Sequence, residues 1–112
     1  MQTKRNYTHK AFDSESRGLV NITKYSIYQP RLVCLYVPMA AWRAIGSPKR
    51  VCVSEASKTI HLPAFNSVKT IAVNNGHIMF TPVLWDADQM IGRWDFEVDE
   101  TEQTITLTNK NL

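Results

Sequence analysis

Cysteine is scarce in this chain of 112 residues, which contains only Cys34 and Cys52. Two cysteines are too few for the disulfide framework of a small secreted domain, so a reducing, cytoplasmic setting is expected. Long apolar runs are also missing: the longest nearly apolar run, Leu32–Trp42, has 11 residues, whereas a membrane helix needs about 20. The polar start of the chain does not resemble a signal peptide. We therefore expect no association with membranes.

Motifs for catalysis and for metal binding are missing as well. The sequence contains no Gly-rich phosphate loop, no nucleophile elbow and no paired-histidine zinc motif. His9, His61 and His77 lie far apart, and the two cysteines are 18 residues apart, which is not a zinc-site spacing. The expectation is a protein without enzymatic activity, metal or cofactor, in which both cysteines are small strand residues.

Charge is present but unevenly distributed. The net charge is +3, yet residues 1–66 carry ten Lys/Arg and three Asp/Glu, whereas residues 67–112 carry three Lys/Arg and seven Asp/Glu. This asymmetry favours either a charged partner on one face or pairing between the two halves.

Two parts of the chain share a series of landmarks in the same order, which predicts an internal repeat. Each part has a strand-like run ending in proline, a short apolar segment that reaches Ile-Gly, and two further strands. The offsets between corresponding landmarks are 44 to 46 residues. The pairs are Arg31–Pro38 with His77–Pro82, Ile45-Gly46 with Ile91-Gly92, Arg50–Val53 with Asp95–Val98, and Lys58–Leu62 with Gln103–Leu107.

A further strand precedes each unit, at Val20–Tyr28 and at Val68–Val73. The second strand is followed by Asn74-Asn75-Gly76, a strong hairpin signal. Each half therefore reads strand, turn, strand, short helix, strand, turn, strand. Residues 1–17 are expected to be a flexible basic arm, and residues 18–112 a single domain with repeats at about 18–66 and 67–108.

The two helices are expected over the apolar segments, Met39–Ile45 and Val83–Ile91. Gly46 and Gly92 stand where a left-handed residue would end each helix. Thr81-Pro82, with Asp86 in the first turn, reads as the start of the second helix.

This pattern resembles the AbrB/SpoVT family, whose unit is shared by MazE-type antitoxins and occurs in tandem in MraZ proteins. The resemblance covers about residues 19–108. It implies a mostly β fold with two short helices: a single-chain, pseudo-dimeric swapped-hairpin barrel made of two ββαββ repeats. Two interleaved units can close a core that one unit cannot. The residues expected to fill this core are Val33, Leu35, Val37, Val51, Val53, Ile60, Leu62, Ile78, Phe80, Phe96, Val98, Ile105 and Leu107.

The resemblance also implies a transcriptional regulator that binds double-stranded DNA through basic residues on the first two strands and the helix. The expected DNA-binding residues are Lys24, Arg31 and Arg43, with Lys49 and Arg50 adding charge. The same cations could instead be a solvated surface that pairs with the acidic half.

The second half departs from the family pattern. His77 stands at the position of Arg31, and Asp86, Asp88 and Gln89 stand where helix residues are often basic. The helix of MraZ proteins typically has an Asp and an Arg four residues apart, and neither expected helix of this sequence contains that pair. A symmetric reader of palindromic DNA is therefore not expected.

A protein inhibitor or adaptor is the alternative function, for example a phage anti-defence or anti-CRISPR-type protein. Its partner would be a basic nucleic-acid-binding protein. Asp95, Glu97 and Asp99 alternate with apolar residues and are expected on one exposed face, with Trp94 as an exposed anchor. Trp42 and Trp85 are expected in the helices and in the core. A third alternative is an antitoxin, although no long tail follows the second repeat.

Overall fold

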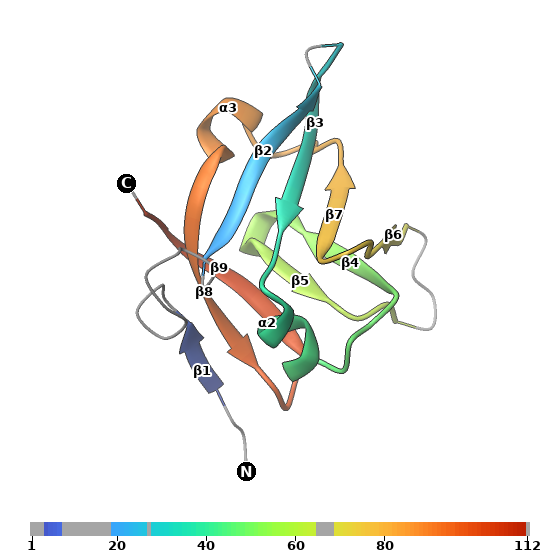
Figure 1. Cartoon of the computed structure of the whole chain (residues 1–112), viewed down its shortest axis with the longest axis vertical. Coiled ribbons are helices and arrows are strands. Elements are labelled where there is room, and N and C mark those ends of the chain that lie inside the picture. Colours follow the sequence, from blue (N-terminus) through green and yellow to red (C-terminus); the bar gives the residue numbers. More distant parts are fainter. Residues whose placement is uncertain (1–3, 8–18, 27, 65–68, 112) are drawn as a thin grey trace.

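The structure is a computed structural model that describes residues 4–7, 19–26, 28–64 and 69–111 (Figure 1). Strands dominate, and two short helices and one 3-10 turn connect them. The elements are β1 (Lys4–Tyr7), β2 (Val20–Ser26), β3 (Gln29–Tyr36), α2 (Met39–Ala44), β4 (Arg50–Ser54), η1 (Glu55–Ser57), β5 (Thr59–His61), β6 (Ile71–Ala72), β7 (His77–Phe80), α3 (Ala87–Met90), β8 (Gly92–Asp99) and β9 (Thr104–Asn111).

Eight strands form one antiparallel path in the order β6-β4-β5-β9-β8-β2-β3-β7. The two end strands, β6 and β7, are joined by the predicted turn, in which Asn74 and His77 exchange two backbone hydrogen bonds of 2.9 Å. Asn75 and Gly76 both have positive φ, at 51° and 81°, as a tight type I′ hairpin turn requires. The sheet is therefore a nearly closed barrel, which confirms the mostly β prediction.

Alternating side chains fill the inside of this sheet. Of the thirteen residues expected in the core, eleven are buried, and Val53 and Leu62 are partly buried against the same cluster. Trp42 is 2% exposed, and its indole N–H donates to the carbonyl of Gly76 at 3.1 Å. The core prediction is confirmed for these residues because the period-two pattern matches the pleat of each strand.

Helix α2 closely follows the prediction. It begins at Met39, directly after Pro38, and ends at Ala44, one residue earlier than expected. Gly46 follows with a φ of +99°, and its N–H donates to the carbonyl of Arg43 at 3.1 Å. Glycine adopts this backbone conformation without the cost that a Cβ atom imposes.

Helix α3 is shorter than predicted and begins later. It covers only Ala87–Met90, so Trp85 lies before the helix and not in it. Asp86 is the N-cap: its Oδ1 accepts the N–H of Asp88 at 3.0 Å. Gly92 opens β8 and does not directly follow the helix, because Ile91 between them is extended. The start predicted at Thr81-Pro82 is wrong because the backbone after Pro82 is bound elsewhere, as described below.

Strand β1 has no counterpart in the sequence prediction, because its four residues show no apolar alternation. It pairs with β8 from Lys4 opposite Asp99 to Tyr7 opposite Phe96. Strand β2 bonds only the first part of β8, at Gly92–Trp94. Strand β1 therefore covers the rest of that strand edge, which would otherwise present unpaired backbone groups. The remainder of the expected arm lies outside the described residues.

In the described part of the chain, no helix is both long enough and apolar enough to cross a membrane.

Candidate functional site

A groove of about 340 Å³ lies between the β2–β3 hairpin and the segment that joins β7 to α3. Lys24 and Arg31 line it from the hairpin, and Trp85, Asp86 and Asp88 line it from the other side. A second hollow of about 300 Å³ also includes Arg31 in its lining. Arg31 is thus shared by two neighbouring depressions, at the end of the molecule where β2 ends and β3 begins (Figure 1).

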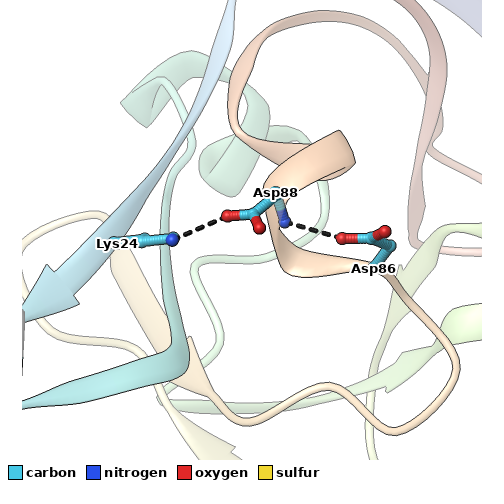
Figure 2. Close-up of polar contacts among 3 residues, drawn as sticks. All are labelled: Lys24, Asp86 and Asp88. Carbon is cyan, nitrogen blue, oxygen red and sulfur yellow. Dashed lines mark hydrogen bonds and ion pairs between the residues drawn. The ribbon is translucent and has the colours of Figure 1, made fainter.

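An ion pair crosses this groove. The ammonium of Lys24 lies 2.6 Å from Oδ1 of Asp88, and the two side chains are 41% and 77% exposed (Figure 2). Asp86 receives the N–H of Asp88 and so fixes the start of α3 beside Lys24. The guanidinium of Arg31 donates to the carbonyl of Pro82 at 3.3 Å, which ties β3 to the same segment.

The backbone that precedes α3 is held by one carboxylate. Glu55 accepts the N–H of Val83 on both oxygens at 3.0 Å, and its Oε1 also accepts from Leu84 at 2.9 Å and from Trp85 at 3.0 Å. The indole N–H of Trp85 donates to the carbonyl of Glu55 at 2.9 Å. Consecutive N–H groups aimed at one anion form a backbone nest. Here the nest is filled by a side chain of the same protein.

This environment shifts the ionisation of Glu55. Burial alone would raise the pKa of its carboxyl group, but hydrogen bonds from Val83, Trp85 and Leu84, together with the charge of Lys69, outweigh burial. The net effect lowers the pKa of Glu55 below its usual value, because the donors stabilise the ionised form. Glu55 is therefore an ionised carboxylate at neutral pH. We call it the clamp, because it holds the N–H groups of Val83, Leu84 and Trp85.

The last turn of α3 is held by side chains from β8 and β9. The indole N–H of Trp94 donates to the carbonyl of Met90 at 2.8 Å, and the ammonium of Lys110 donates to the carbonyl of Gln89 at 2.8 Å. Met90 itself is buried. These contacts fix a helix of only four residues, which could not persist in isolation.

The structure gathers only part of the predicted basic set in this groove. Lys24 and Arg31 line it together, whereas Arg43 is exposed on α2, near the opposite end of the long axis (Figure 1). Lys49 is exposed in the loop after α2. Arg50 is engaged at the β4–β6 edge, where its Nε donates to Oγ1 of Thr70 at 2.6 Å and its Nη2 to the Thr70 carbonyl at 2.9 Å.

The predicted acidic face is not an exposed face. Trp94, expected as an exposed anchor, is 7% exposed and belongs to the core, so that expectation is wrong. Asp99 is also 7% exposed, and its Oδ1 accepts the N–H of Glu102 at 3.0 Å in the β8–β9 turn. Its side chain turns back to the chain because the turn N–H needs an acceptor. Asp95 and Glu97 are half-buried.

Sequence reasoning missed Glu55, because its partners Val83–Trp85 are 28 to 30 residues away and only the folded chain brings them together. It also missed three strongly exposed apolar side chains: Tyr28, Val83 and Leu84 are 87%, 75% and 70% exposed. A signal did exist for Asp86, since an aspartate just before a short helical run is a preferred N-cap.

The thiols of Cys34 and Cys52 are free and lie in β3 and β4, as small strand residues. Burial raises the pKa of the Cys34 thiol. Cys52 donates to the carbonyl of Lys69 at 3.2 Å. Within the described residues, no three His, Cys, Asp or Glu side chains are grouped closely enough to hold a metal ion.

Comparisons of the chain with protein-family models, with curated proteins and with solved structures found no match in any of the three.

Proposed function

We propose that the chain is a single-chain pseudo-dimer of two ββαββ units in a swapped-hairpin arrangement, and that it binds duplex DNA through the exposed ends of β2 and β3. The strand pairing carries this proposal. If β2, β3, β4 and β5 correspond to β6, β7, β8 and β9, the pairing β2–β8 corresponds to β6–β4, and the pairings β3–β7 and β5–β9 correspond to themselves. A two-fold relation between the halves accounts for all four.

The residue register supports the same two-fold relation. In the β3–β7 pair, Val33 lies opposite Phe80 and Tyr36 lies opposite His77. With the sequence offset of 44 residues, these two pairs exchange places when the halves are exchanged. In this register His77 corresponds to Val33 and not, as expected from the sequence, to Arg31. In the β5–β9 pair, Ile60 lies opposite Ile105, its own counterpart at an offset of 45 residues.

Backbone conformation supports it as well. Lys58 and Gln103 are 45 residues apart, and each has a positive φ in the turn before the last strand of its half, at 53° and 56°. A positive φ is uncommon for residues other than glycine. Its recurrence at equivalent positions argues for two copies of one unit.

The DNA-binding part of the proposal depends on the charges of the first half. Lys24 and Arg31 lie on neighbouring strands, near the end of β2 and the start of β3, and both are exposed. In the family that the sequence resembles, basic residues on these two strands contact DNA. Cations on one face would contact backbone phosphates and make the affinity depend strongly on salt. Exposed Arg43 and Lys49 would add phosphate contacts farther away.

The test is a titration of a labelled mixed-sequence duplex at low and near-physiological salt, with Arg31→Glu and Arg43→Glu as matched charge reversals at two ends of the molecule. We expect salt-dependent binding that Arg31→Glu weakens more than Arg43→Glu does. Circular dichroism would verify that both variants fold, since Arg31 also contacts Pro82. Absence of binding at low salt would overturn the function, and equal losses would overturn the β2–β3 assignment.

A second candidate, a protein-binding adaptor, is favoured by a different observation. Val83 and Leu84 are large apolar side chains that a charged clamp holds in solvent, and exposed apolar groups often mark protein contacts. If the duplex titration is negative, capture by the wild type should be compared with capture by a Val83→Ser/Leu84→Ser variant. A partner retained equally by both would exclude this surface.

A further inference from the structure

The ion pair across the groove places a carboxylate against a cation that the proposed function requires. Lys24 is one of the two basic residues at the β2–β3 end, and Oδ1 of Asp88 lies 2.6 Å from its ammonium (Figure 2). Carboxylate and phosphate oxygens are equivalent acceptors for an ammonium group. Asp88 therefore occupies the contact with the Lys24 ammonium that a phosphate oxygen would need.

The position of Asp88 is fixed by contacts on several sides. The Glu55 clamp and the Arg31–Pro82 hydrogen bond hold the segment that leads into α3. The Asp86 cap fixes the first turn, and the contacts of Trp94 and Lys110 fix the last. The carboxylate is thus presented by an anchored backbone, and not by a loop that happens to approach Lys24.

We propose that Asp88 is a built-in competitor of DNA phosphate at Lys24, an autoinhibitory contact that lowers the affinity for duplex. This inference rests on the proposed function. A duplex that reaches Lys24 must first break its pair with Asp88, whose side chain is 77% exposed. The second half of the chain has no basic site that matches Lys24 and Arg31. It instead contributes Asp88, the residue that inhibits the first half.

The size of the effect follows from the exposure of the pair. Exposed ion pairs are weak, so removing the negative charge should strengthen duplex binding by about two- to fivefold and not by orders of magnitude. The gain must depend on Lys24, because the competition takes place at that ammonium.

The experiment measures duplex affinity at about 50 mM salt, where phosphate contacts are strong, for the wild type, Asp88→Asn, Lys24→Ala and the double variant. Glu102→Gln is the control: it removes the same charge from an exposed residue in the β8–β9 turn, at the end of the molecule opposite α3 (Figure 1). We expect Asp88→Asn to bind two- to fivefold more tightly, Glu102→Gln to bind like the wild type, and Asp88→Asn to add little once Lys24 is alanine.

The results distinguish a failure of the Asp88 competition from a failure of DNA binding itself. If the wild type binds duplex and Asp88→Asn binds no more tightly, or gains no more than Glu102→Gln, the inference is overturned and the DNA-binding proposal stands. A gain that persists without Lys24 also overturns it. If neither the wild type nor Asp88→Asn binds at this salt concentration, the proposed function fails and the inference fails with it.

Discussion

The chain leaves β3 at Pro38 and β7 at Pro82, and the two segments that follow differ in structure. After Pro38, helix α2 begins at once and buries Trp42 in the core. After Pro82, the next three residues bind Glu55, the helix begins only at Ala87, and Trp85 is half-buried against Phe80 with ring centroids 5.3 Å apart.

This difference shows how one distant side chain can decide a local conformation. The N–H groups of Val83, Leu84 and Trp85 would be free donors in the first turn of a helix begun at Pro82. Glu55 satisfies all three together, in the bend that leads to α3. The first segment is thus held by its indole in the core, and the second by a carboxylate at the surface.

Each of the two segments contains one tryptophan, and replacing these residues should give the greatest loss of stability. Trp42→Ala should lower the free energy of unfolding by about 3–5 kcal/mol, because it leaves a large cavity in the core. Trp85→Ala should cost less, about 1–3 kcal/mol, since its ring is half-buried and it loses one hydrogen bond. Urea unfolding of both variants measures this, and equal losses would contradict the contrast between core and surface.

Removing the Glu55 carboxylate should destabilise the second segment. Glu55→Ala removes the acceptor for three backbone N–H groups and should lower the free energy of unfolding by about 1–3 kcal/mol. Hydrogen exchange should speed up at the amides of Val83, Leu84 and Trp85, while the amides of α2 keep their protection. Glu102→Ala, at an exposed position, is the control. Unchanged exchange at the three amides would mean that they do not depend on Glu55.

The end of the first segment depends on the positive φ of Gly46. Gly46→Ala should cost about 1 kcal/mol, because alanine is strained at a φ of +99°. Gly46→Asn should cost less, since asparagine tolerates left-handed conformations better. Thermal unfolding of the two variants tests this order, and an alanine variant as stable as the wild type would refute the argument.

The smallest effect concerns pH. The pKa of Glu55 is lower in the folded chain than its ordinary value, so the folded state binds fewer protons at this group than the unfolded state does. The clamp should contribute its full stability above about pH 5 and lose it as pH falls through the lowered folded-state pKa. The stability difference between the wild type and Glu55→Gln, measured from pH 7 to pH 3, should shrink in the acidic range. A constant difference would argue against this assignment.

The order of elements was predictable because alternation, Pro and Gly are local signals. Val33, Leu35 and Val37 alternate along their strand, and Asn75-Gly76 supplies a turn chemistry that few other residues allow. Helix α2 was predictable for the same reason, since both its start and its end are marked in the sequence.

The candidate site was less predictable, because its contacts join distant residues. Lys24 could be picked out as a cation, but its pairing with Asp88 depends on the packing of α3 beside β2. Trp94 is buried on the same face of β8 as Phe96 and Val98, so the alternation did mark it as a core residue. Asp99 breaks the alternation because its carboxylate accepts an N–H of the β8–β9 turn, which the strand pattern does not reveal. Glu55 carries no local mark of its role as a clamp.

The strand order also constrains how the protein can be made. Each strand from β2 to β5 has one neighbour close in sequence and one in the second half of the chain: β8 for β2, β7 for β3, β6 for β4 and β9 for β5. During synthesis, every strand of the first half therefore leaves the ribosome with one edge unpaired and must wait for its partner. The barrel can close only after β9 has emerged, so folding depends on long-range, intrinsically slow pairing.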